Sequence, residues 1–263
     1  MARTETLVSR NEKGSTPLGS ATFIALRLLD PFLQYGLLIH GWGDPLIRLL
    51  GGRPLPLEGP VLVLGLPYWR LSIFAMAVAG CAKTIFYLVY VSRMAMPVRA
   101  AVFVGFFKLF STTVNTLLFC TTATSAASAF LSARSVEPDT IPLPPVLLVA
   151  SWAVFVVGMA IENVAELQRK AFKDDPRNKG KPFTGGLFSA ARHINYGGYA
   201  IWKSAAAMAA CGYWWGGLTL AWLIAEFRRR VIPEIDAYCT ERYGAGWVNF
   251  KNTTRYKMIP YIY

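Results

Sequence analysis

The stretch GGLFSAARHINYGGYAIWKSAAAMAACGYWWGGLTLAWLIAEF, residues 185–227, decides the fold of this chain. It passes from a glycine pair and a cluster of polar side chains into an apolar run, 194–227, that is too long for one membrane span. Cys211 and Gly212 interrupt this run, so we expect a tight hairpin of two short helices at about 194–210 and 214–228. Polar groups at the mouth of a membrane helix are costly, and they therefore indicate a functional site.

The composition of the whole chain is typical of a polytopic helical membrane protein. Of the 263 residues, 54% are hydrophobic and 16% are charged, with a mean hydropathy of +0.37. Soluble domains carry about a quarter charged residues. Further apolar runs at 20–40, 71–91, 100–121 and 146–164 predict the other spans. We therefore expect an all-α membrane helical bundle of about six to seven transmembrane helices.

The charges predict how the chain is placed in the membrane. We expect a disordered cytosolic lead at 1–18 and two transmembrane halves at 19–150 and 151–263, which the resemblance given below implies to be a substrate-side half and a cofactor-binding half. An even number of spans places both termini in the cytosol, and most of the 27 Lys and Arg residues then lie on that side, as the positive-inside rule requires.

The same charges bear on the partners of the chain. The net charge of +12 follows from the membrane topology rather than from a basic tract interleaved with aromatic residues, so we expect no nucleic-acid partner. The expected partners are the lipid bilayer and a hydrophobic small molecule, and the sequence indicates no oligomeric state. The four cysteines lack the spacing of metal ligands, so no metal site is predicted.

Polar residues recur at helical spacing within three of the spans. These sets are Lys83, Tyr87 and Tyr90, then Lys108, Thr112 and Asn115, and finally Asn195, Tyr199 and Lys203. Each set forms one polar line, which should face a protein interior or a wet cavity. A phenol beside an ammonium can donate a proton, so we expect the first set to be catalytic and the second to bind the substrate. The alternative is that these groups only form hydrogen bonds between helices.

Two further groups of polar residues have more than one interpretation. Arg27, Asp30 and Gln34 share one helix face, for which we predict ion pairing inside the bundle. If the fourth span continues into the basic loop, four charged residues also share one face: Glu162, Glu166, Lys170 and Lys173. Deep carboxylates with outlying cations suit a nucleotide, although i, i+4 pairs on a solvated helix end fit equally well. His193, beside Arg192, is more typical of a phosphate or amide contact than of a general base.

The C-terminal part of the chain resembles a known family. Cys239-Thr-Glu-Arg-Tyr-Gly-Ala-Gly-Trp247-Val-Asn-Phe250 and the final Pro260-Tyr-Ile-Tyr263 are similar to the C-terminal signature of the sterol C14 and C7 reductases. Arg192-His-Ile-Asn-Tyr-Gly-Gly198 is similar to that family's Arg-His-x-Asn-Tyr-x-Gly, and Gly185-Gly-Leu-Phe188 resembles the steroid 5α-reductases. This resemblance covers about residues 160–263.

The resemblance implies an endoplasmic-reticulum enzyme that uses NADPH to reduce a carbon–carbon double bond in a hydrophobic, steroid- or terpenoid-like substrate. It also implies which residues line the NADPH pocket. By matching positions these are Glu166, Lys170, Lys173, Arg192, His193, Asn195, Tyr196 and Tyr256. To them we add Glu162, one turn before Glu166, and Tyr199.

Tyr199 stands where the reductases carry an acidic residue, so a contact to the cofactor is lost or replaced. This departure keeps a non-redox role open, and the motif itself keeps a methyltransferase open. The isoprenylcysteine carboxyl methyltransferases have a similar Arg-His-Pro-x-Tyr-x-Gly and use S-adenosylmethionine, which implies a methyltransferase. The other alternative is a non-redox isomerase, cyclase or lipid-binding protein. Asn195 and the tail favour the reductases, so the sequence predicts a membrane NADPH-dependent ene-reductase.

Overall fold

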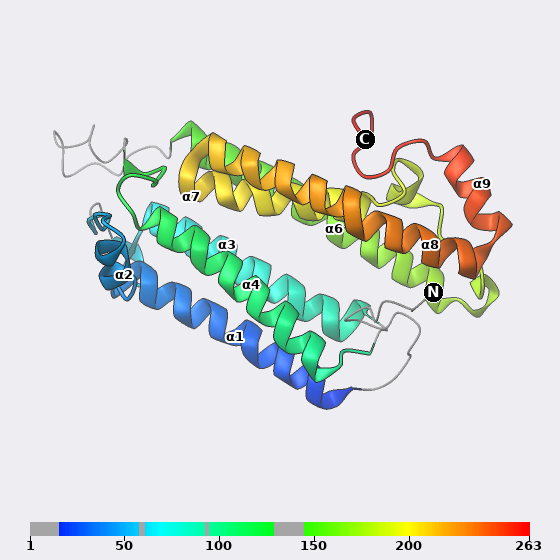
Figure 1. Cartoon of the computed structure of the whole chain (residues 1–263), viewed down its shortest axis with the longest axis horizontal. Helices are drawn as coiled ribbons and strands as arrows, with labels where there is room; N and C mark the ends of the chain where they lie inside the picture. The colour runs from blue at the N-terminus through cyan, green and yellow to red at the C-terminus, as the bar shows by residue number, and fades with distance from the viewer. Residues whose placement is uncertain (1–15, 58–60, 93–94, 129–144) are drawn as a thin grey trace. The chain divides into compact units, whose positions relative to one another are not determined.

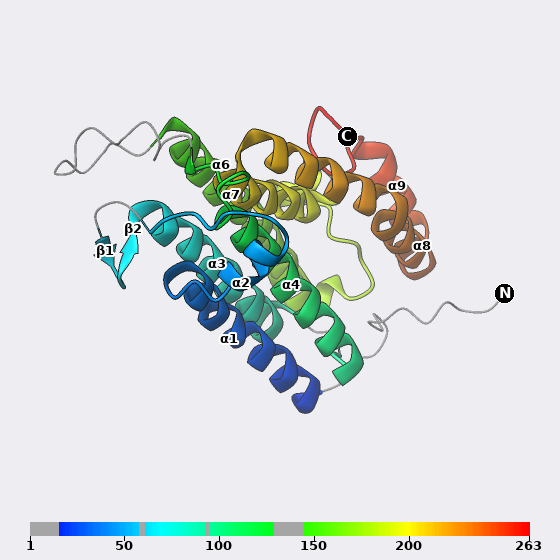
Figure 2. The same cartoon turned by 60° about the vertical axis from the view of Figure 1, so that its left-hand side comes forward.

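A computed structural model describes residues 16–57, 61–92, 95–128 and 145–263 (Figures 1 and 2). Residues 1–15 of the expected disordered lead lie outside this part of the chain, and the first helix already begins at Pro17. The chain divides into two compact units, Met1–Leu143 (unit 1) and Pro144–Tyr263 (unit 2). The division falls near the boundary expected at 150, and the substrate-side and cofactor-side roles of the halves stay predictions.

Unit 1 is built on three long helices that run side by side (Figure 1). They are α1 (Pro17–Ile39), α3 (Tyr68–Phe86) and α4 (Val98–Phe119), and α1 packs against both of the others. A π-helical turn, η1 (Tyr87–Val91), extends α3. Proline precedes α3 and α4 and opens α1, where its missing N–H is no loss because the first turn has no intrahelical acceptor for it.

The Gly- and Pro-rich loop between α1 and α3 contains short elements of its own. They are α2 (Asp44–Leu49), β1 (Val61–Val63) and β2 (Leu66–Pro67), the two strands forming an antiparallel pair. The buried guanidinium of Arg70 donates hydrogen bonds to the carbonyls of Leu38, at 2.5 Å, and Leu55, at 2.7 Å. One side chain of α3 thus holds the end of α1 and the loop together.

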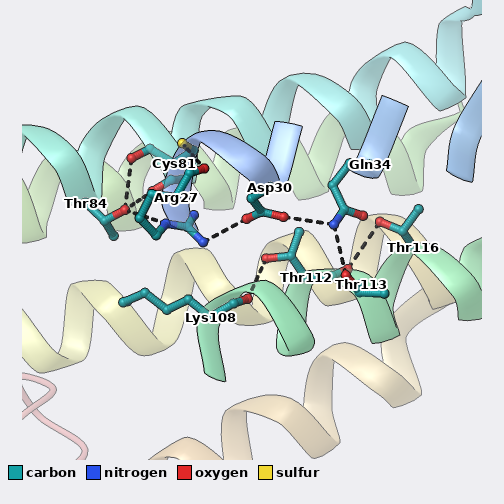
Figure 3. Close-up of polar contacts among 10 residues, drawn as sticks. Arg27, Asp30, Gln34, Cys81, Thr84, Lys108, Thr112, Thr113 and Thr116 are labelled. Atoms are coloured by element: carbon teal, nitrogen blue, oxygen red, sulfur yellow. Dashed lines mark hydrogen bonds and ion pairs between the residues drawn. The ribbon is translucent and has the colours of Figure 1, made fainter. Parts of the chain in front are cut away.

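A buried polar network crosses unit 1 and confirms the predicted ion pairing (Figure 3). Arg27 Nη1 lies 2.8 Å from Asp30 Oδ2, and Gln34 Nε2 donates to Asp30 Oδ1 at 2.8 Å. The exposed fractions of Arg27, Asp30 and Gln34 are 3%, 0% and 0%. A buried ion pair is stable only when its charged groups also have hydrogen-bond partners. This requirement holds the Arg27–Gln34 face of α1 against α3 and α4.

Two threonines extend the network to the other helices. Arg27 Nε donates to Thr84 Oγ1 of α3 at 3.1 Å, and Gln34 Nε2 donates to Thr113 Oγ1 of α4 at 3.1 Å (Figure 3). The spacing of the charged residues predicts neither threonine as a partner, because helix rotation decides which hydroxyl faces α1. The network therefore couples all three long helices of unit 1.

Unit 2 consists of a long helix, a folded-back helix and a C-terminal tail. Its elements are α6 (Val146–Asp174), η2 (Pro176–Asn178), η3 (Gly186–Ser189), α7 (Ile194–Glu226), η4 (Phe227–Val231), α8 (Ile232–Tyr243) and α9 (Ala245–Thr253). Helix α6 packs along α7, and α9 packs on α8. Helix α6 extends beyond the predicted span of 146–164, which fulfils the condition for placing Glu162 to Lys173 on one continuous helix.

The expected hairpin is present within α7, where the chain reverses at Cys211 and Gly212 (Figure 1). Gly212 has φ +83°, a left-handed conformation that glycine adopts without a steric cost. A Cβ on Gly216 would lie 2.7 Å from Met208 Cβ and 3.1 Å from the carbonyl oxygen of Ser204. In a straight helix residues 204 and 216 would be about 18 Å apart. Their contact therefore shows that the chain reverses and that the two legs of α7 pack against each other.

Among the residues that the structure describes, five helices are long and apolar enough to cross a membrane, and the chain is an integral membrane protein. They are Pro17–Ile39, Tyr68–Val91, Val98–Phe119, Val146–Asp174 and Ile194–Tyr243. The last of these contains the reversal at Gly212, so its two legs correspond to the two short helices predicted from the sequence. The predicted fold class, an all-α membrane bundle, is confirmed.

Candidate functional site

Two buried carboxylates on α6 are the centre of the candidate site in unit 2. Glu162 and Glu166 lie one helical turn apart and are 8% and 4% exposed. Trp202 Nε1 donates to Glu162 Oε2 at 2.6 Å, and Asn195 Nδ2 donates to Glu166 Oε1 at 2.7 Å. Both donors come from the first leg of α7. Because a buried carboxylate is stable only with such partners, each acid is held in one orientation.

Glycines allow the backbones of α6 and α7 to touch at this point. A Cβ on Gly198 would lie 2.6 Å from the backbone nitrogen of Glu162 and 2.8 Å from the carbonyl oxygen of Gly158. A Cβ on Gly158 would lie 2.6 Å from the backbone nitrogen of Trp202. This close approach brings the short side chain of Asn195 within reach of Glu166.

The cations expected to clamp phosphates are drawn into contacts within unit 2. Lys170 Nζ lies 2.6 Å from Asp174 Oδ2. Arg169 donates to Glu166. Lys173 Nζ donates to Tyr243 Oη at 3.1 Å and to the carbonyl of Lys181, and lies 4.6 Å from the ring centroid of Tyr243. Lys170 thus forms an i, i+4 pair with Asp174, and Glu166, the glutamate one turn before Lys170, pairs with Arg169 instead.

The side chain of Arg192 also forms hydrogen bonds within unit 2. Its guanidinium donates to the carbonyls of Thr254, at 2.6 Å, and Lys251, at 3.2 Å. Burial lowers the pKa of the Arg192 guanidinium from its ordinary value, and the carboxylate of Asp236 acts in the opposite direction. The arginine therefore ties the C-terminal tail to the start of α7.

Backbone hydrogen bonds join the C-terminal tail to Arg192 and His193. The N–H of Arg192 donates to the carbonyl of Tyr256 at 3.0 Å, and the N–H of His193 donates to that of Lys257 at 2.7 Å. His193 is buried, with its ring centroid 6.1 Å from Tyr196 and 6.2 Å from Trp247. The two sequence motifs of the C-terminal half thus meet in space.

Aromatic rings line α7 beside the carboxylates. The ring centroid of Tyr196 lies 4.9 Å from that of Phe227, and the centroid of Tyr199 lies 5.9 Å from Phe227 and 5.3 Å from Trp202. Tyr196 and Tyr199 are half-buried, whereas Trp202 and Phe227 are buried. Sequence reasoning missed Trp202 and Phe227. A buried indole N–H needs an acceptor, which would have pointed to a carboxylate partner for Trp202.

The predicted catalytic residues lie in unit 1 and do not form one line. Lys83 is buried, with its Nζ 5.5 Å from the ring centroid of Tyr87. Tyr90 is 55% exposed and stacks on Phe86 with centroids 5.3 Å apart. Since Tyr87 begins the π-helical turn η1, the helical spacing that aligned Tyr90 with Lys83 no longer holds there.

The predicted substrate-binding residues lie half-buried on α4. They are Lys108, Thr112 and Asn115. The Thr112 hydroxyl donates to the carbonyl of Lys108 at 3.0 Å, within its own helix (Figure 3). The next residue, Thr113, lies on a different face of α4 and accepts a hydrogen bond from Gln34 of α1. The roles expected for these residues stay predictions.

Comparison with known proteins gives one family and two relatives. Residues 89–228 match a family described as protein of unknown function (DUF1295). Probable O-methyltransferase ustE of Ustilaginoidea virens is 36% identical over 251 residues, which cover 93% of this chain and 86% of the relative. Delta(14)-sterol reductase ERG24B of Gibberella zeae is 26% identical over 172 residues, covering 46% of this chain and 35% of that protein.

These findings correct the predicted function. The NADPH-dependent ene-reductase is wrong, because the similarity that covers nearly the whole chain is to a probable O-methyltransferase, whereas the sterol reductase matches distantly and in part. NADPH keeps only the support of that partial match. The geometry agrees with the correction, since Lys170, Lys173 and Arg192 are engaged within unit 2 rather than gathered for phosphates.

Proposed function

The chain belongs to the family of proteins of unknown function (DUF1295), and on that premise we propose that it is an integral membrane O-methyltransferase that uses S-adenosylmethionine. The observation that carries the proposal is the 36% identity to a probable O-methyltransferase across 93% of the chain. The acceptor would be an oxygen of a hydrophobic small molecule that reaches the enzyme from the bilayer. We further propose the endoplasmic reticulum as its location, with both termini in the cytosol.

The site in unit 2 suits this cofactor better than a dinucleotide. S-adenosylmethionine carries positive charge and no phosphate, and bound in the site it would supply an electrophilic methyl group. Glu162 offers a buried carboxylate that accepts a hydrogen bond from the neutral indole of Trp202, while Glu166 is paired with Arg169 and Lys170 with Asp174. Carboxylates can hold ribose hydroxyls or an amino group through charge-assisted hydrogen bonds. His193, Asn195, Tyr196 and Tyr256 would complete the walls.

Residues of this chain would contribute orientation and exclusion of water. The Asn195 and Trp202 donors hold the two carboxylates in place before the cofactor arrives, which lowers the entropic cost of binding. Oxygen methylation is an in-line displacement, so correct positioning is a large part of its catalysis.

The first prediction concerns cofactor choice in the detergent-purified protein. A ligand that binds only the folded state stabilises it by about 2.7 kcal/mol at one hundred times its Kd. We expect S-adenosylmethionine to raise the melting temperature and NADPH to leave it unchanged, as measured by a thermal-shift titration of each. Stabilisation by NADPH alone would contradict the methyltransferase proposal.

The second prediction locates the site on α6. Replacing Glu166→Gln should weaken the binding of S-adenosylmethionine about tenfold, because a charge-assisted hydrogen bond becomes a neutral one. Glu241→Gln is the matched control, since Glu241 is exposed on α8. Isothermal titration calorimetry measures both variants. Equal affinities in the two variants would place the cofactor elsewhere.

A further inference from the structure

The hairpin of β1 and β2 in unit 1 has an exposed apolar tip. Its sequence, Val61-Leu-Val-Leu-Gly-Leu-Pro67, contains no charged residue. Leu62, Val63 and Leu64 are 44%, 59% and 55% exposed, whereas Leu66 is buried at the base of the hairpin. Three adjacent apolar side chains exposed on a loop are unfavourable in water unless they contact a partner. The tip therefore needs an apolar environment.

The turn of this hairpin has a leucine where the backbone favours other residues. Val63 pairs with Leu66, so Leu64 and Gly65 form a two-residue turn, with φ values of +60° and +74°. Asparagine, aspartate and glycine adopt this left-handed conformation more easily than leucine does. Because the leucine is unfavourable for the backbone and its side chain is exposed, its presence indicates a function for the apolar side chain.

The turn lies beside the ends of two membrane spans. The Tyr35 hydroxyl donates to the carbonyl of Leu64 at 3.0 Å, and a Cβ on Gly65 would lie 3.4 Å from Ile39 Cδ1. Tyr35 lies four residues before the end of α1, about 6 Å along the helix axis. Its ring centroid is 5.8 Å from that of Phe74, six residues after α3 begins. The hairpin is therefore folded back along the spans.

A tryptophan marks the same level of α1. The backbone N–H of Trp42 donates to the carbonyl of Gly36 at 3.3 Å, and a Cβ on Gly36 would lie 2.1 Å from the Trp42 ring. Trp42 is 49% exposed. Exposed tryptophan and tyrosine side chains gather where the hydrocarbon of a bilayer meets its headgroups. Trp42 and Tyr35 thus place the tip of the hairpin at this boundary.

We propose that residues 62–64 insert among the lipid acyl chains at the headgroup boundary and anchor the loop between α1 and α3 in the leaflet where α1 ends. The apolar tip continues the lipid-facing surface of the two spans. A two-stranded hairpin has unpaired backbone groups on its outer edges, which exclude it from the hydrocarbon core but not from the hydrated boundary. At the turn itself the Leu64 carbonyl is satisfied by Tyr35. This anchor is independent of the proposed methyl transfer.

The first test measures the depth of the tip in the full-length protein, reconstituted in phosphatidylcholine nanodiscs. A nitroxide is attached at position 63 through a ketone-bearing amino acid, which leaves the four native cysteines unlabelled. Its collisions with oxygen, which concentrates in lipid, and with a water-soluble nickel chelate are measured by electron paramagnetic resonance. The lipid control is position 110, since Phe110 is 55% exposed on the span α4, and the water control is the exposed Lys179.

Nickel collisions at position 63 should be several-fold fewer than at position 179, and oxygen collisions should approach those at position 110. Nickel collisions equal to those at position 179 would place the tip in water and overturn the anchor. Few collisions with either reagent would show that protein covers the tip, from unit 2 or from a second copy, and would overturn it as well.

A second test uses the turn itself, because water and lipid predict opposite signs. Leu64→Asn improves the turn but introduces a polar side chain. In water this variant would raise the melting temperature, whereas at an inserted tip it should lower it in nanodiscs. Leu64→Ala is the matched control, since it shortens the apolar side chain without improving the turn, and it should lower the melting temperature by less. A rise with asparagine, or no change with alanine, would overturn the anchor.

Discussion

Replacing Asp30→Leu is expected to lower the free energy of unfolding by about 3–5 kcal/mol, because the guanidinium of Arg27 would remain buried without its counter-charge. Arg27 is 3% exposed and its Nη1 lies 2.8 Å from Asp30 Oδ2, and the remaining side-chain contact, to Thr84, is a neutral hydroxyl. Unfolding in mixed detergent micelles measures the loss.

The matched control removes both charges at once. The double variant Arg27→Met/Asp30→Leu should recover most of the lost stability, since a buried ion pair is often replaced by apolar residues at little cost. A double-mutant cycle then isolates the coupling between the two residues. The cycle also needs the single variant Arg27→Met. If the double variant lost as much free energy of unfolding as Asp30→Leu and Arg27→Met lose together, the two residues would not be coupled.

The second large effect is expected at the contact between α6 and α7. Gly198→Ala should cost about 1–3 kcal/mol and also weaken cofactor binding, because a Cβ there would lie 2.6 Å from the Glu162 backbone nitrogen and force the helices apart. Separation would lengthen the hydrogen bonds that orient Glu162 and Glu166. Thermal unfolding and calorimetric titration measure the two consequences.

Gly217→Ala on the other leg of α7 is the control for this prediction. A Cβ on Gly217 meets no atom within 4 Å, so alanine should be neutral or stabilising by up to about 1 kcal/mol through its higher helix propensity. The contrast between two Gly→Ala changes in one helix separates close packing from helix propensity. Similar losses at both sites would show that the α6–α7 approach is not the cause.

The membrane fold could be predicted from the sequence because apolar runs of about 20 residues are long enough to cross a bilayer as helices. Gly212 shows why the reversal within α7 was also predictable, since a glycine break in an overlong run leaves a hairpin as the simplest solution. The threonine partners of Arg27 and Gln34 were not predictable. Thr84 and Thr113 are chosen by the rotation of α3 and α4, which depends on packing across the whole unit.

The function was predicted less well, for a reason visible in unit 2. The guanidinium of Arg192 donates to the carbonyl of Thr254, and the backbone N–H groups of Arg192 and His193 donate to those of Tyr256 and Lys257, so the motif that suggested a reductase describes a way of folding the C-terminal half. Such a motif can be shared by enzymes with different cofactors. Tyr199, which stands where the reductases carry an acidic residue, is the position at which this chain departs from that motif.

The reversal of α7 has a consequence for how two dissimilar reactants could meet. Because the helix turns back at Gly212, the polar segment before Ile194 and the arginines of η4 emerge at the same end of the hairpin, while its turn points away from them. In the proposed reaction a water-soluble donor would approach that end, and an oily acceptor would arrive sideways from the lipid. The protein would then work as a phase-transfer catalyst, fixed where two immiscible solvents meet.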